Sequence, residues 1–158
     1  MNTSPEQFML QHILGLCEGH ADALRDALHD MGPLDRVLER YSQLSKADRR
    51  LLDQFAYRYT RLQDDMGTRL MPAILKVLGE EVSAMSAIDR FARLEQLGWL
   101  PSADAWAELR QIRNQFTHDY PDDTGERLER LHAACAAAGQ LLIIMERFGE
   151  RIRRLLPK

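Results

Sequence analysis

The stretch LLDQFAYRYTRLQDDMGTRLMPAIL, residues 51–75, decides the fold class. Its apolar side chains recur at steps of three or four residues, which is the spacing of one face of an α-helix. With one residue from the preceding segment, the face consists of Leu44, Leu51, Leu52, Phe55, Tyr59, Leu62, Met66, Leu70 and Ile74. The pattern predicts one long helix over 45–78. Pro72 should kink or restart it, because proline lacks the N–H that a helix interior uses.

Capping signals predict where the other helices begin and end. Ser4, Ser45 and Ser86 are each followed three residues later by a polar side chain, which is the spacing of a capping box. Ser102 and Asp123 are further candidate N-caps. The predicted stops are Gly32, Pro33, Gly79, Gly98 and Pro121.

These boundaries predict an all-α protein. We expect one or two helices over 4–42, then helices over 45–78, 86–97, 102–118 and 123–155. Short connections favour antiparallel neighbours. The expected architecture is an up-and-down bundle of four to six helices that forms a single domain over 1–158.

The composition is that of an ordinary soluble domain. The 158 residues are 45% apolar and 28% charged, with a formal net charge of −3. This charge argues against nucleic-acid binding through overall charge but leaves a local basic patch open. Cys17 and Cys135 are far apart and form no CxxC pattern, so we interpret them as two reduced thiols.

Neither a membrane segment nor a cofactor site is expected. The N-terminal segment has no basic region typical of a signal peptide, and the most apolar stretch, 131–145, is too short to span a bilayer. There is no HExxH motif, and His12, His20 and His29 do not have metal-chelating spacing. We predict a cytoplasmic protein without membrane contact, metal or cofactor.

A polar run closes the predicted helix over 102–118. It reads RNQFTHDYP, with Arg113, Asn114, His118 and Tyr120 before the proline at 121. Proline biases the residue before it away from helical geometry, so the helix should end at or just after His118. Asn114 and His118 share a face. In a regular helix the side chains of Arg113 and His118 would point in different directions. A loosened last turn, or a second copy of the chain, is therefore needed to bring an arginine and a histidine together.

The chain contains a second copy of the arginine–histidine spacing, which serves as a control. Arg127 and His132 are also five residues apart. In this copy leucine follows the arginine, and Ala134 occupies the place of the tyrosine. We interpret the second copy as a chance match and the first as a motif.

The pattern R-N-x-x-x-H-x-Y at a helix end, in a small helical protein, resembles the HEPN superfamily and, more narrowly, the HepT-type toxins. The segment 54–67 is also similar to the second helix of such proteins. The resemblance implies a metal-independent ribonuclease that acts on RNA such as tRNA or mRNA as a homodimer, with both motifs lining one cleft. It also implies a nucleotidyltransferase antitoxin that adenylylates the motif tyrosine. Carried over, Arg113 and His118 are the catalytic pair, Asn114 is the orienting neighbour, and Tyr120 is the modification site.

The residue types suit RNA cleavage, but two other interpretations stay open. The RNA 2′-OH can attack the adjacent phosphate if a histidine moves protons and an arginine stabilises the developing charge. Alternatively, Arg113, Asn114 and His118 only cap a helix end. The third interpretation is a non-catalytic HEPN module that partners a nucleotidyltransferase or binds nucleotides.

A charged run on the long helix is a second candidate region. Arg58, Arg61, Asp64 and Asp65 are expected opposite the apolar face, where such a run is usually solvated. The functional interpretation makes them cleft-lining, with Arg58 and Arg61 on phosphates and Asp65 orienting a group in the cleft.

Overall fold

The computed structural model describes residues 3–33, 36, 43–117 and 124–157, and no β-strand occurs among them. The helices are α1 (Pro5–Met31), α3 (Lys46–Asp65), α4 (Met71–Val77), α5 (Ala87–Gln96), α6 (Ala103–Thr117) and α7 (Thr124–Leu155). Two short turns, the π-helical η2 (Met66–Leu70) and the 3-10 η3 (Val82–Ala84), complete the described elements. The prediction of an all-α helical bundle is confirmed.

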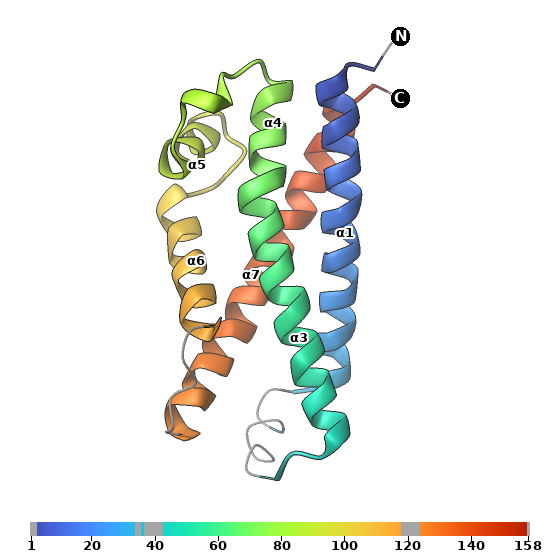
Figure 1. Cartoon of the computed structure of the whole chain (residues 1–158), viewed down its shortest axis with the longest axis vertical. Helices are drawn as coiled ribbons and strands as arrows, with labels where there is room; N and C mark the ends of the chain where they lie inside the picture. The colour runs from blue at the N-terminus through green and yellow to red at the C-terminus, as the bar shows by residue number, and fades with distance from the viewer. Residues whose placement is uncertain (1–2, 34–35, 37–42, 118–123, 158) are drawn as a thin grey trace.

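The long helices lie side by side along the long axis of the molecule (Figure 1). α1 packs against α3, α4 and α7, and α6 packs against α3 and α7. α7 is tilted and crosses behind the other helices, while the short α5 lies across the end of α6 and against α4 (Figure 1). A single cluster of buried apolar side chains runs through all of these helices.

The predicted helix starts are confirmed where the structure describes them. The hydroxyls of Ser4, Ser45 and Ser86 each accept a hydrogen bond of 3.1 Å from the backbone N–H three residues later. Ser102 caps α6 in the same way, at 3.0 Å. The stops at Gly32, Gly79 and Gly98 are confirmed by their positive φ angles. The predicted cap at Asp123 and stop at Pro121 lie outside the described residues.

The long helix contains a π-helical turn that the sequence analysis did not predict. In η2 the Met71 N–H donates to the Met66 carbonyl, five residues back instead of four. Pro72 then lies in the first turn of α4, where its missing N–H costs no hydrogen bond. Regular α-helical geometry resumes at Met71, one residue before Pro72, and Figure 1 shows α3, η2 and α4 as one continuous rod.

The apolar face of this rod forms the centre of the core. Its fully buried members are Phe55, Tyr59, Leu62, Met66, Leu70 and Ile74. Burying a side chain of this size stabilises the fold by about 1.5–3 kcal/mol. Leu51 and Leu52 are only half-buried, and Leu44 precedes the first residue of α3. The predicted face is thus confirmed over its central and C-terminal parts.

The apolar stretch 131–145, predicted to be too short to span a bilayer, belongs to a longer helix, α7. This helix has 32 residues, and the segment Gly125–Leu155 is long and apolar enough to cross a bilayer by length and composition alone. A core helix of a soluble protein passes the same test, and 33% of the apolar window in this segment is buried inside the protein. One helix of this kind is weak support for membrane insertion.

Candidate functional site

The last turn of α6 is fixed against α3 by aromatic packing. Phe116 contacts the rings of Phe55 and Tyr59 edge-on, at centroid distances of 5.9 and 5.7 Å. Phe55 and Tyr59 stack on each other and are fully buried. The packing sets the rotation of α6, and the Arg113 side chain consequently extends toward α3.

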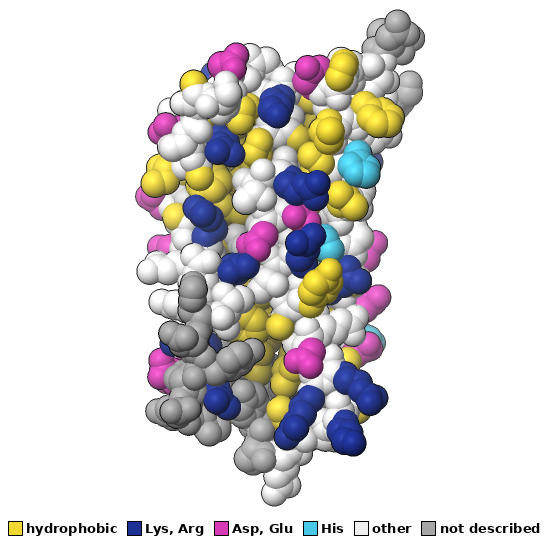
Figure 2. Space-filling model, viewed as in Figure 1, with side chains coloured by type: hydrophobic (Ala, Val, Ile, Leu, Met, Phe, Trp, Pro, Cys, Tyr) yellow, Lys and Arg dark blue, Asp and Glu magenta, His cyan; other side chains and the backbone are white. Residues whose placement is uncertain are grey.

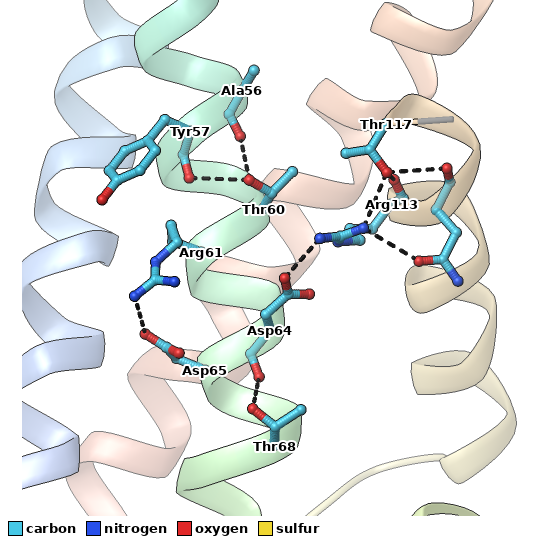
Figure 3. A network of polar contacts seen from close by, with 10 residues as sticks. Ala56, Tyr57, Thr60, Arg61, Asp64, Asp65, Thr68, Arg113 and Thr117 are labelled. Carbon is cyan, nitrogen blue, oxygen red and sulfur yellow. Dashed lines mark hydrogen bonds and ion pairs between the residues drawn. The ribbon is translucent and has the colours of Figure 1, made fainter. Parts of the chain in front are cut away.

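Arg113 is held by a network of charged and polar contacts (Figure 3). Its Nη2 donates to Asp64 Oδ2 on α3 at 2.7 Å, and its Nη1 donates to Thr117 Oγ1 at 3.0 Å. A longer contact of 3.5 Å joins Nη1 to Asn114 Oδ1. The Arg113 side chain is only 22% exposed. These contacts restrain the guanidinium before any ligand binds, which is the condition for a preorganised charge.

The buried Tyr59 lies close enough to Arg113 to feel its charge. Burial raises the pKa of the Tyr59 phenol, and the positive charge of Arg113 acts in the opposite direction. The hydroxyl has no hydrogen-bond partner among the described residues. Tyr59 is therefore a neutral phenol whose ring packs against Phe55 and Phe116.

His118 and Tyr120 lie outside the described residues, which break off after Thr117. The structure therefore places Arg113 and Asn114, the first two residues of the motif, on the last described turn of α6. The distance from Arg113 to His118, the contribution of a second chain and the modification of Tyr120 stay predictions.

The second candidate region is a separate cluster on the flank of α3 that faces α1. Arg58, Arg61 and Asp65 lie there with His20 of α1, which the sequence analysis did not select. His20 Nε2 is 3.4 Å from Asp65 Oδ2, and Arg58 Nη1 is 3.0 Å from His20 Nδ1. Arg61 Nη2 is 3.9 Å from Asp65 Oδ2.

The contacts of His20 define its protonation. An arginine can only donate, so Nδ1 of His20 must be the unprotonated acceptor and Nε2 carries the proton toward Asp65. Burial lowers the pKa of His20; Asp65 opposes this shift, and Arg58 and Arg61 add to it. His20 is therefore a neutral link between α1 and α3.

The expected position of Asp65 opposite the apolar face is wrong. Asp65 is only 6% exposed, because α1 packs over this flank of α3. Figure 3 shows Asp64 directed toward Arg113 and Asp65 on the side of Arg61. Within the described chain, Arg58, Arg61 and Asp65 do not join Arg113, and their predicted cleft-lining role is untested. His20 could have been selected from the sequence by its position beside the apolar face of α1, next to the buried Ala21.

The surface around these clusters has mixed charge. Figure 2 shows Lys and Arg side chains in the middle of the face over α3 and α4, with Asp and Glu side chains among them. Because positive and negative side chains are mixed, any attraction of this face for an anion is local.

Within the ranges that the structure describes, no group of three or more His, Cys, Asp or Glu is placed to hold a metal ion.

The two cysteines are unpaired thiols with low reactivity. Cys17 is buried and Cys135 is half-buried. Burial, with a contribution from Asp65, raises the pKa of Cys17 to about 12, and burial raises the pKa of Cys135 to about 11. Thiols with such pKa values are protonated near neutral pH and are poor nucleophiles.

The control copy of the spacing lies on α7, in regular helix. His132 is exposed to solvent there. In the first copy, by contrast, the described residue Arg113 is only 22% exposed and is paired with Asp64 of α3.

Comparisons with family models, with curated proteins and with solved structures give no match to this chain. The HEPN resemblance therefore rests on the motif over 113–120 and on the helical architecture.

Proposed function

We propose that this chain is a metal-independent endoribonuclease of HEPN type, acting in the cytoplasm as the toxin of a toxin–antitoxin pair. The observation that carries the proposal is the environment of Arg113. The first residue of the motif is restrained by Asp64 and Thr117 at the end of α6, between two packed helices. A helix end that needed only a cap would not require an ion pair to a residue 49 positions away in the chain.

Each residue has a defined task in this reaction. The RNA 2′-OH attacks the neighbouring phosphorus, and the bond to the 5′-oxygen breaks. Arg113 stabilises the negative charge that develops on the phosphate oxygens. His118 transfers protons, because a histidine titrates near neutral pH. Asn114 orients the phosphate.

The partners follow from the same proposal. A second copy of the chain completes the cleft, so that Arg113 of one copy can act with His118 of the other. A nucleotidyltransferase antitoxin adenylylates Tyr120, and the added nucleotide blocks RNA sterically and repels its phosphates.

The test is RNA cleavage in EDTA with total tRNA and an mRNA as substrates. We expect His118→Ala and Arg113→Ala to lower the rate by roughly 10²–10⁴-fold while circular dichroism shows an intact fold. The chain supplies matched controls: Arg127→Ala and His132→Ala, which remove the same residue types at the same spacing, should cleave like the wild type. Absence of cleavage by folded wild type, with Tyr120 shown by mass spectrometry to be unmodified, would contradict the proposal.

One observation favours a second candidate, the non-catalytic binding module. Both Nη groups of Arg113 already have partners in Asp64 and Thr117, which leaves fewer donors for a phosphate. This candidate predicts that the chain binds a nucleotidyltransferase or a nucleotide and leaves RNA intact at any protein concentration.

A further inference from the structure

A cavity of about 410 Å³ lies beside Arg113, between the α3–η2 segment and helices α5 and α6. Pockets for small molecules typically measure about 300–1,000 Å³. One wall comes from the π-helical turn, through Gly67 and Thr68. The wall from α6 contains Arg113 and Asn114, so the cavity adjoins the motif.

The charged side chains of the cavity favour an anion. Three arginines, Arg90, Arg110 and Arg113, face a single carboxylate, Asp64. Within the described part of the chain, Asp64 is paired with Arg113, while Arg90 and Arg110 have no carboxylate partner. The Arg110 guanidinium lies 5.2 Å from the centre of the Phe91 ring, which holds it at the cavity wall. Arginine donors in this arrangement suit a phosphate group.

The polar atoms of the cavity wall include buried groups without partners. Gln63 is only 2% exposed, and neither Oε1 nor Nε2 has a hydrogen-bond partner among the described residues. The same holds for the Nε atoms of Arg90 and Arg113. Buried polar groups are nearly always hydrogen-bonded in folded proteins, and exceptions require an explanation. A ligand in the cavity that brings complementary polar groups is such an explanation.

The Gln63 amide narrows the class of ligand. It presents one acceptor and two donor hydrogens on a flat group, an arrangement that pairs with the complementary edge of a nucleobase. Phe91 lines the same cavity, but it is only 4% exposed and Arg110 lies over its ring, so its role is to hold Arg110. Phosphate-binding and base-binding groups therefore meet in one cavity.

We infer that this cavity binds one nucleotide of the RNA substrate, with the base at Gln63 and the phosphate at Arg90, Arg110 and Arg113. The inference rests on the ribonuclease function proposed above. Gln63 is then a specificity-determining residue, because its amide discriminates between bases by their hydrogen-bonding edges. Arg113 links the cavity to the cleavage chemistry.

The first experiment measures binding without cleavage. Trp106 is fully buried and packs near Gly67 of the cavity wall, and Trp99 is the other tryptophan of the chain. The full-length Trp99→Phe variant therefore reports on the cavity through Trp106 fluorescence. The four nucleoside 5′-monophosphates and inorganic phosphate are titrated separately. We expect saturable binding with a preference for one base, and weaker binding of phosphate alone.

Variants in this background test the assignment. Gln63→Leu should remove the preference among bases and lower the affinity for the preferred nucleotide roughly 10-fold. Arg110→Gln changes an exposed residue and should lower the affinity for all four nucleotides and for inorganic phosphate together. The matched control is Gln140→Leu on the exposed side of α7, which should bind like its parent. Unchanged nucleotide affinities in both Gln63→Leu and Arg110→Gln would overturn the inference, as would the absence of binding.

The second experiment separates this inference from the ribonuclease proposal. Short RNAs that differ at one position are cleaved by wild type and by Gln63→Leu. Sequence discrimination by wild type that is lost in the variant supports the RNA assignment. Cleavage with equal sequence preference in both proteins overturns it while leaving the ribonuclease intact. Nucleotide binding that depends on Gln63, without RNA cleavage by wild type, overturns the ribonuclease proposal and assigns the cavity to a free nucleotide.

Discussion

Asp64 and Asp65 are neighbours in sequence but belong to different interfaces. Asp64 has a 45% exposed side chain and pairs with Arg113 of α6 at 2.7 Å. Asp65 has an 8% exposed side chain and contacts His20 of α1 at 3.4 Å. Successive residues on a helix point roughly 100° apart, so one helix can direct two adjacent carboxylates to two partners.

The difference in exposure assigns the two carboxylates different roles. An exposed ion pair contributes about 0–1 kcal/mol to stability, so the main effect of Asp64 is to orient Arg113. A buried polar contact costs more to break, because the remaining group loses both its partner and water. Asp65 therefore holds α1 against α3. Substitutions at the two positions should separate into an effect on activity and an effect on stability.

The largest effect is expected at Asp65. Asp65→Ala leaves the His20 Nε2–H and Arg61 without their acceptor, and should lower the free energy of unfolding by about 2–3 kcal/mol. For a chain of this size, that lowers Tm by roughly 4–12 °C. Urea and thermal unfolding measure it, with Asp53→Ala at an exposed position of α3 as the control. A loss below about 1 kcal/mol, the value of a surface pair, would contradict the buried role.

The next effect is expected at Asp64. Asp64→Asn keeps the volume of the side chain but removes the charge that holds the guanidinium of Arg113. Misplacement of a catalytic group by about 1 Å can cost roughly 10²-fold, so RNA cleavage should fall by roughly 10–100-fold. The free energy of unfolding should change by less than about 1 kcal/mol. Single-turnover cleavage rates, compared with those of Asp53→Asn, measure the effect. If Asp64→Asn cleaves at the wild-type rate, Asp64 does not position Arg113.

The smallest effect is a pH dependence of stability at His20. Burial places the pKa of His20 in the folded protein below its ordinary value of 6.5. The unfolded chain then binds the proton more tightly, so the contribution of His20 is fully present above pH 6.5 and decreases as pH falls toward the lowered pKa. Urea unfolding between pH 5 and 7.5 should show this decrease in wild type.

A substitution isolates this contribution. His20→Gln can keep both hydrogen bonds and does not titrate, so its stability should vary less with pH than that of wild type. The control, His132→Gln on the exposed side of α7, should follow the wild-type curve. Identical pH profiles for wild type and His20→Gln would contradict a His20 pKa that burial lowers in the folded protein.

The features predicted correctly from the sequence are local ones. The capping boxes at Ser4, Ser45 and Ser86 involve residues three apart, and the positive φ angles at the predicted stops belong to single glycines. The spacing of apolar residues also identified the buried face of α3, because residues three or four apart lie on the same side of an α-helix.

The features missed depend on neighbours distant in sequence. Asp65 lies on the flank of the apolar face, and only the packing of α1 over that flank buries it. The pairing of Arg113 with Asp64 joins positions 49 residues apart, and no local spacing signals it. Arg113 and Asn114 could be selected from the motif, whereas Gln63 could not, since its buried amide is apparent only when α5 and α6 are in place.

The π-helical turn has the geometry of a one-residue insertion in a helix. Its hydrogen bond spans five residues instead of four, so α4 is rotated by roughly 100° from the orientation that an uninterrupted α-helix would give it. An uninterrupted α-helix of the same sequence would turn Ile74 and Leu75 away from the core, whereas deletion of the exposed Thr68 would remove the extra residue and leave both side chains facing it. The insertion therefore lets one rod present Gln63 and Asp64 to the cavity while its next segment keeps its apolar side chains inside.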